Sequence, residues 1–155
     1  TPLPLPLIPP SRCFSFPTAM PQDIFAQQVF NVYISLLQSG QVDELLLYYT
    51  LTAQKSLSLK SAYSMCFTPS EMKTQLQSLV GCAFVVHGIT VQRGITWVLL
   101  VCSGVCQVQG QQHGFCHTLI LVPSRTGPAT TLAGIPADEP KYQIQNDALV
   151  LLANE

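Results

Sequence analysis

Three apolar segments in the last third of the chain constrain its fold more than any other feature. The segments span 95–102, 118–122 and 148–152, and none of them alternates apolar with polar residues. Successive side chains of a β-strand point to opposite faces, so a sheet with one solvated face alternates in polarity along each strand. Both faces of these strands therefore need cover. One layer of helices covers one face, and the other face is free for a partner.

Composition predicts a single domain with an unusually neutral surface. The chain has 155 residues, which is enough for one domain with a real core. Charged residues make up 10% of the chain, the net charge is −1, and the cations are scattered. Without a basic stripe to follow phosphates, we expect no direct nucleic-acid binding. The apolar runs are shorter than the ~20 residues that cross a bilayer, so we expect no membrane span.

The cysteines favour a reduced protein. An even number of cysteines suggests a disulfide framework in short secreted chains, but this chain is long enough to form a core without one. We therefore expect free, buried thiols and an intracellular protein. The six residues are Cys13, Cys66, Cys82, Cys102, Cys106 and Cys116.

The order of the predicted elements indicates an α+β domain. A Pro-rich extended arm or linker occupies 1–21, and one domain follows over 22–155. Its apolar periodicity predicts helices and then strands, with a long loop over 124–140. This order favours helices packed on one face of a curved antiparallel sheet. The predicted helices span 22–37, 42–49 and 69–79, the last capped by Thr68, and the predicted strands span 56–59, 82–92, 95–109, 115–123 and 142–152.

Several short motifs lie in a fixed order along the chain, at 36–40, 45–49, 56–59, 103–105, 115–124 and 142–149. In this order and spacing, they resemble the nuclear transport factor 2-like domain of the nuclear RNA export factors. The resemblance covers roughly 22–155, and the arm is similar to the linker that precedes this domain in the family. Three departures are a short segment between Leu59 and Cys82, a short hairpin near Gly110, and a long loop before Tyr142.

The resemblance implies a non-catalytic interaction scaffold that acts in nuclear RNA export. Family members pair through the exposed sheet face with a small export cofactor of the same fold, and the pair docks Phe-Gly repeats of nucleoporins. We therefore expect a nuclear protein that shuttles to the pore. A diverged paralogue in nuclear RNA silencing or retention, and a homodimeric adaptor of the stress-granule type, remain as alternatives.

The partner interface is predicted on the apolar strands, and the sequence does not fix which face points outward. Trp97, Leu99 and Val101 share one parity of their strand, whereas Val98 and Leu100 share the other. The other predicted interface residues are Leu119, Leu121, Asp147 and Leu149.

The resemblance also implies positions for a Phe-Gly pocket, namely Gln22, Phe25, Pro123 and Tyr142. These sites are mostly aliphatic in the export factors. Phe25 and Tyr142 are bulky, so we expect them to occupy the pocket at least in part.

Two chemical alternatives deserve a test against the structure. The first is a zinc site, since five residues are of zinc-ligand types: Cys102, Cys106, His113, Cys116 and His117. Residues 102 and 106 of one strand, however, lie about 13 Å apart.

The second is a cavity enzyme, because the fold of the resembling family also hosts enzymes with a conical cavity. The acid–base candidates for such a cavity are Tyr33, His87, His117 and Asp147. Because Leu and Val dominate the other inward positions, we expect a filled cavity and no enzyme activity. We also expect neither a metal ion nor a cofactor.

Overall fold

The computed structural model describes residues 21–59, 62–123 and 142–152, with side chains from Ile24 onward. The predicted arm, apart from Pro21, and the predicted loop over 124–140 lie outside the described residues. None of the described helices is long and apolar enough to cross a membrane.

The helices begin and end where local chemistry predicts. The first helix, α1 (Pro21–Gln38), carries a broad apolar stripe and stops before Gly40, whose φ of 77° suits glycine. The third, α3 (Pro69–Gln77), starts with a capping box: the Thr68 side chain accepts from the Glu71 amide, and the Glu71 carboxylate accepts from the Thr68 amide. Thus local signals sufficed for both helices.

The second helix is shorter than the sequence predicts. α2 (Val42–Leu46) ends three residues before the predicted end, and strand β1 (Tyr49–Leu59) starts after a turn of two residues. The predicted strand over 56–59 is therefore only the last part of β1. The apolar run continues through this junction, so periodicity alone could not locate the change from helix to strand.

Six strands form one sheet in the order β2-β1-β6-β5-β4-β3. The edge strand β2 (Ala62–Cys66) was not predicted, and it pairs with the end of β1. Neighbouring strands are antiparallel except β1 and β6, which run parallel. The remaining strands are β3 (Ala83–Arg93), β4 (Val98–Val108), β5 (Gln111–Pro123) and β6 (Tyr142–Leu151).

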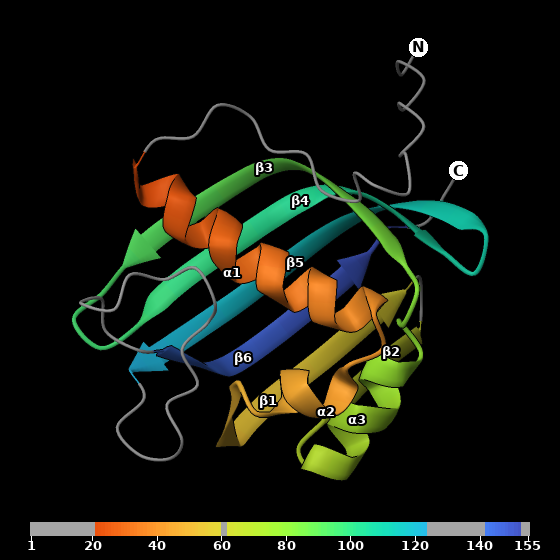
Figure 1. The fold of residues 1–155 in the computed structure, drawn as a ribbon, viewed down its shortest axis with the longest axis horizontal. Coiled ribbons are helices and arrows are strands. Elements are labelled where there is room, and N and C mark those ends of the chain that lie inside the picture. Colours follow the sequence, from red (N-terminus) through yellow and green to blue (C-terminus); the bar gives the residue numbers. More distant parts are fainter. Residues whose placement is uncertain (1–20, 60–61, 124–141, 153–155) are drawn as a thin grey trace.

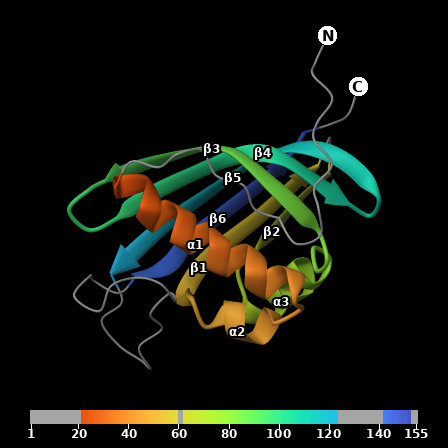
Figure 2. The ribbon, with the colours of Figure 1, turned by 45° about the horizontal axis from the view of Figure 1, so that its top comes forward.

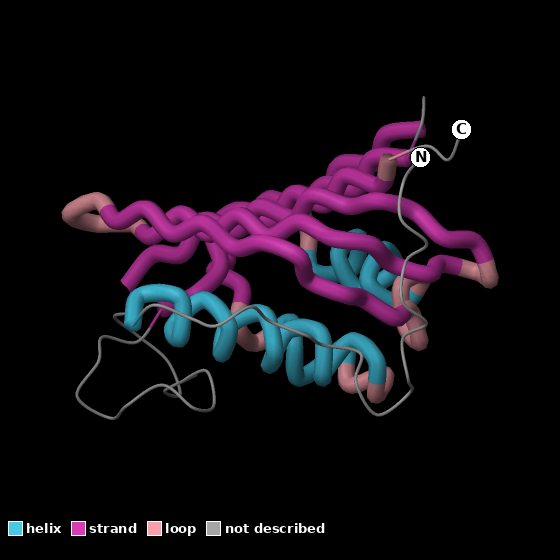
Figure 3. Tube along the Cα trace, turned by 90° about the horizontal axis from the view of Figure 1, so that it is seen from above, coloured by secondary structure: helices cyan, strands magenta, loops and turns pink. Residues whose placement is uncertain are grey.

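All three helices lie on one side of the sheet. α1 crosses the strands diagonally, and α2 and α3 pack near β1 and β2 (Figures 1 and 2). Seen edge-on, the sheet is curved, and none of the described helices covers its other side (Figure 3). The core fills the space between the helices and the sheet, with Phe30, Leu37, Leu100 and Leu119 fully buried there.

Two register breaks change which residues face the helices. In β3 the break falls at His87, and in β6 it falls at Gln145. Burial in β6 follows Tyr142 and Ile144, then shifts by one residue to Asp147 and Leu149. An extra residue in one strand turns every following side chain to the opposite face. The bulge at Gln145 therefore directs Asp147 into the core.

Candidate functional site

The sheet side that faces away from the helices, hereafter the outer face, is the first candidate site. Strand pairing places its residues in transverse rows. One central row runs from β1 to β3 through Ser56, Ala148, Thr118, Val101 and Thr90. The adjacent rows are Ser58, Val150, Cys116, Ser103 and Gly88, and Gln54, Asn146, Ile120, Leu99 and Gln92.

The outer face is neutral. Among its described residues in these three rows there is no Asp, Glu, Lys or Arg. Val85 and Val105 extend it; both are buried, yet neither belongs to the core cluster under the helices. The central row and the adjacent row from Ser58 to Gly88 consist of small side chains, which permits the close approach of a second surface. Isolated exposed apolar residues are ordinary, but a continuous uncharged sheet surface is not.

The structure separates the predicted interface residues into two groups. Leu99 and Val101 lie on the outer face and are half-buried. Trp97 precedes β4 in the hairpin turn after β3 and is 41% exposed. The others point toward the helices and are buried, so they cannot meet a partner on the outer face: Val98, Leu100, Leu119, Leu121, Asp147 and Leu149. The choice of face depends on helix packing, which the non-alternating pattern does not encode.

A buried polar cluster under the helices is the second candidate site. Its centre is Asp147, which is 1% exposed. Tyr33 Oη donates to Asp147 Oδ2 at 2.7 Å, Tyr49 Oη also donates to Oδ2, and His117 Nε2 lies 2.7 Å from Oδ1. The His117 ring also packs edge-on against Tyr33, with centroids 4.8 Å apart. We call Tyr33, Tyr49, His117 and Asp147 the Asp147 cluster.

A buried lysine adds positive charge beside this cluster. Lys55 pairs with Asp147 in the β1–β6 ladder and is 0% exposed. Its Nζ donates to Gln75 Oε1 at 2.8 Å, and Gln75 Nε2 donates to the Ser64 carbonyl and hydroxyl at 3.3 and 3.1 Å. A buried ammonium needs a counter-charge, and Asp147 is the acid beside it.

The environment fixes the charge of the cluster. Burial alone would raise the pKa of Asp147, but the Lys55 ammonium and then His117 lower that pKa below its ordinary value. Burial, followed by the charge of Asp147, raises the pKa of Tyr33 and of Tyr49 well above the ordinary tyrosine value. At neutral pH the cluster therefore holds one carboxylate with two neutral phenols as donors.

The acid–base candidates are brought together in part. Tyr33, His117 and Asp147 meet, whereas His87 lies exposed at the β3 bulge. Tyr49 and Lys55 were missed, because a tyrosine after an apolar run and a lysine between polar residues give no distinctive signal. The donors all point at one carboxylate. Two hollows among the described residues, one beside α3 and one near Gly81 and Gly110, are not lined by any residue of the Asp147 cluster.

The zinc-ligand types do not converge. Cys102 pairs with His117 and Cys106 with His113 on the helix side of the sheet, while Cys116 lies on the outer face. His113 Nδ1 lies 3.1 Å from the Leu152 carbonyl. No three His, Cys, Asp or Glu side chains in the described part of the chain are grouped as metal ligands.

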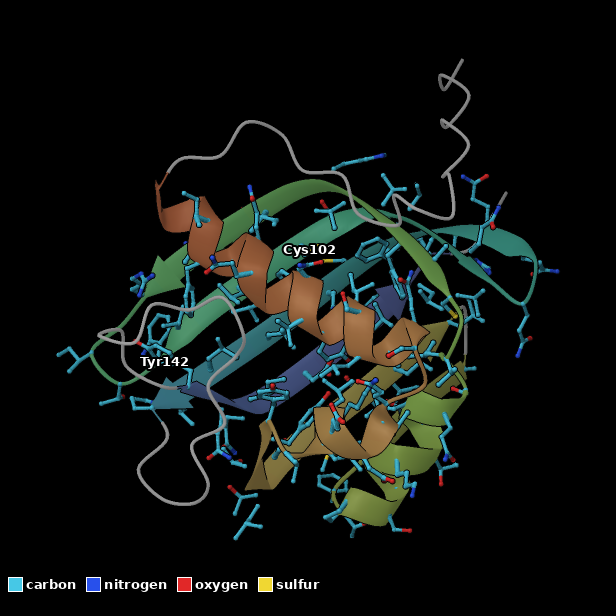
Figure 4. All side chains as sticks on the ribbon, in the orientation of Figure 1. Cys102 and Tyr142 are labelled. Atoms are coloured by element: carbon cyan, nitrogen blue, oxygen red, sulfur yellow. The ribbon has the colours of Figure 1, made fainter. Side chains whose placement is uncertain are left out.

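The predicted Phe-Gly positions do meet at one end of the sheet. Phe25 and Tyr142 pack edge-on with centroids 5.6 Å apart, and Tyr142 pairs with Pro123. The Arg93 guanidinium lies over the Phe25 ring, 5.0 Å from the ring centroid. Figure 4 shows Tyr142 at this end and Cys102 further along the sheet beside α1. Both rings are buried, so they fill the position themselves; the Gln22 side chain lies outside the described ones.

Comparison with solved structures identifies the architecture. A putative calcium/calmodulin-dependent protein kinase II association domain from Xanthomonas campestris superposes with a TM-score of 0.65 at 11% identity, covering 91% of this chain and 94% of that one. A protein from Novosphingobium aromaticivorans described as nuclear transport factor 2-like gives 0.59 at 12% identity, covering 86% and 83%. This chain has the nuclear transport factor 2-like fold. The predicted α+β class and fold are thus confirmed.

The same fold appears in a ketosteroid isomerase-like protein from Erwinia carotovora, with a TM-score of 0.55 and 11% identity over 85% of this chain and 96% of that one. No protein-family model matches the sequence. No curated protein matches it either. At such low identities, the nuclear transport factor 2-like architecture is shared and the activities are not transferred.

Proposed function

We propose that this chain is a non-catalytic interaction scaffold that pairs, through its outer face, with a small chain of the same fold. The neutral outer face carries the proposal. A curved sheet with uncharged, mostly small side chains complements a second sheet of the same kind, because neither surface must desolvate a charge. Two such faces can approach to the ~10 Å spacing of packed sheets.

The size of the outer face fits this partner. The sheet has six strands, of which β1, β3 and β4 have 11 residues each. With ~4.8 Å between strands and ~3.3 Å per residue, the face measures about 24 by 36 Å, or about 850 Å². A standard protein interface buries about 800 Å² per partner. The outer face is therefore large enough for one stable complex.

The biological setting we propose is nuclear RNA export, with the export cofactor as the partner. The nuclear transport factor 2-like fold supports this reading together with the sequence motifs that resemble the export factors. On this proposal the chain is nuclear and contacts RNA only through other domains or partners. Silencing or retention by a diverged paralogue, and a homodimeric adaptor, would use the same outer face.

Charge reversal on the two faces tests the pairing. We expect Leu99→Asp to abolish copurification with a tagged export cofactor while the circular dichroism of the domain stays unchanged. Leu100→Asp, its 0% exposed neighbour, should instead unfold the domain. Gln77→Asp, at an exposed position of α3, should change neither the copurification nor the circular dichroism. Pairing that survives both Leu99→Asp and Val101→Asp would refute the outer-face proposal.

Light scattering on the chain alone separates the two kinds of dimer. A soluble dimer without a cofactor, dissociated by Leu99→Asp, would establish the homodimeric adaptor. Aggregation that co-expression of the cofactor prevents would establish the heterodimer. A soluble monomer that does not bind the cofactor would refute both the homodimer and the heterodimer.

Docking of Phe-Gly repeats requires an opening at the sheet end. Phe25 is 7% exposed and Tyr142 is 9% exposed, and they pack against each other. We expect a labelled Phe-Gly peptide to bind Phe25→Ala more tightly than the wild type, because burying a repeat Phe in the vacated slot contributes about 1.5–3 kcal/mol. Tight wild-type binding that Phe25→Ala weakens would show instead that Phe25 is itself part of the docking site.

A cavity enzyme is the second candidate, favoured by the Asp147 cluster and by the ketosteroid isomerase-like protein of the same fold. General acid–base catalysis needs a substrate within hydrogen-bond reach of the carboxylate. In this chain the Asp147 oxygens already accept bonds from Tyr33, Tyr49 and His117. Saturable quenching of Trp97 fluorescence by a small hydrophobic ligand, lost in Asp147→Asn but kept in Asp43→Asn, would favour the enzyme over the scaffold.

A further inference from the structure

A second surface, away from the outer face, has the features of a small-molecule site. A hollow of about 500 Å³, hereafter the α3 groove, opens between α3 and the β1–β2 hairpin. Pockets for small ligands commonly measure about 300–1,000 Å³ and combine apolar walls with a few placed polar groups. The α3 groove has this combination, with Leu57, Met65 and Cys66 beside Ser64 and Gln75.

The buried Lys55 lies directly behind the floor of the α3 groove. Cys66 is its ladder partner on β2, and Leu57 follows two residues later on the same face of β1. Gln75 covers the ammonium from α3 through the bond of 2.8 Å to its Oε1. Three residues that line the groove therefore surround Lys55.

The Lys55 ammonium has unused hydrogen-bonding capacity. An ammonium group carries three donors. Among the described residues, its hydrogen bond is to Gln75 Oε1, and Lys55 is 0% exposed. Buried donors without acceptors are costly, so such a group favours any additional acceptor that can reach it. The α3 groove offers an approach, because Gln75 both lines the hollow and accepts the hydrogen bond from Nζ.

We propose that the α3 groove binds a small, mostly apolar molecule with a neutral carbonyl group, whose oxygen accepts a hydrogen bond from a Lys55 donor that Gln75 Oε1 leaves unused. A neutral carbonyl reproduces the amide oxygen that Lys55 binds now. The Lys55 charge is already balanced by Asp147, and Glu71 at the rim of the groove opposes a ligand carboxylate. Primary amides and ketones are thus the expected class, and fatty acids are disfavoured.

Titration of the isotope-labelled domain with hexanamide tests the site by backbone amide shifts. We expect saturable shifts at Leu57, Cys66 and Gln75, with a Kd on the order of 1 mM as befits a fragment of this size. Hexanoate should bind at least tenfold more weakly. Equal or tighter binding of hexanoate would overturn the neutral-carbonyl assignment, and absence of saturable shifts would overturn the site.

Two substitutions on α3 provide matched controls. Thr74→Trp places a large ring at a residue that lines the α3 groove and should abolish binding of hexanamide. Gln77→Trp makes the same change at an exposed residue that does not line it and should leave binding intact. Shifts that persist in Thr74→Trp would place the ligand elsewhere and refute the proposal.

Chemical rescue tests the role of Lys55. Gln75→Ala removes the amide oxygen, so hexanamide should bind this variant about tenfold more tightly and raise its melting temperature more than that of the wild type. Adding Lys55→Met should remove the gain. If Gln75→Ala binds hexanamide no more tightly than the wild type, or keeps its gain without Lys55, then the carbonyl does not reach the ammonium and the proposal fails. If Gln75→Ala does not fold, the titrations of the wild type and Thr74→Trp decide alone.

Discussion

Replacing Asp147 with Asn removes the one carboxylate of the buried cluster while keeping its shape. Asp147 accepts hydrogen bonds from Tyr33, Tyr49 and His117, and its charge compensates the 0% exposed Lys55. In Asp147→Asn the ammonium stays buried without a counter-charge, and the amide nitrogen turns one donor toward other donors. Leaving a buried charge uncompensated costs about 3–5 kcal/mol.

Urea unfolding followed by circular dichroism measures this loss. Domains have about 5–15 kcal/mol of stability, so we expect Asp147→Asn to remain folded in water. With a slope of about 2 kcal/mol per M urea, the midpoint should fall by roughly 2 M. The exposed pair of Asp43 with Lys73 at 2.9 Å is the matched control. Such a pair contributes about 0–1 kcal/mol, so Asp43→Asn should move the midpoint by less than ~0.5 M.

A double variant shows whether Lys55 is the cause. Lys55→Met combined with Asp147→Asn removes both charges, so its loss of stability should be clearly smaller than the sum of the two single losses. Additive losses would show that Lys55 and Asp147 act independently. A loss below about 1 kcal/mol in Asp147→Asn would refute the argument that the carboxylate compensates a buried charge.

Three further predictions concern pH, thiol reactivity and packing. The pKa of Asp147 is lowered in the folded state, so as the pH falls this carboxylate is protonated first in the unfolded chain, around the ordinary Asp pKa of about 3.9. The stability that the Asp147 carboxylate contributes is therefore complete above about pH 5 and is lost as the pH falls further. Acid unfolding of Asp147→Asn should lack this loss. Iodoacetamide should modify Cys116 on the outer face before the buried Cys102, whose pKa is raised to about 12 by burial, and pairing with a partner should protect Cys116 in peptide mass spectra. Gly104→Ala should lower the urea midpoint by about 1 M or more, since its Cβ would lie 1.9 Å from the Val85 carbonyl oxygen; an unchanged midpoint would contradict the close β3–β4 contact.

Features with a local cause were predictable from the sequence. The α3 start follows from Thr68 and Glu71 alone, and α1 follows from its apolar stripe. The short edge strand β2 lacks such a signal, because its first residues are exposed and only Cys66 is buried. Its strand conformation comes from pairing with β1, which is a tertiary contact that no short window encodes.

The polar cluster was only half predictable, for a similar reason. His117 and Asp147 stand in apolar strands, where a polar residue is conspicuous. Lys55 lies between Gln54 and Ser56 and resembles a solvent-exposed strand residue. Lys55 is buried because α3 packs beside it, and Gln75 of that helix accepts a hydrogen bond from its ammonium group. The electrostatic attraction between Lys55 and Asp147 arises only once β1 and β6 lie side by side.

The bulge at Gln145 connects the two candidate sites. Gln145 has no partner in the described β1 and β5 ladders, but its amide bonds to the Thr52 carbonyl at 3.1 Å and accepts from Thr50 Oγ1 at 2.8 Å. If Gln145 followed regular alternation instead of forming a bulge, Asn146 would turn inward and Asp147 would turn onto the outer face. The bulge thus keeps the Asp147 charge inside and the outer face neutral. The sequence pattern does not mark this bulge, which explains why the parity of the strand could not be read from its uniformly apolar end.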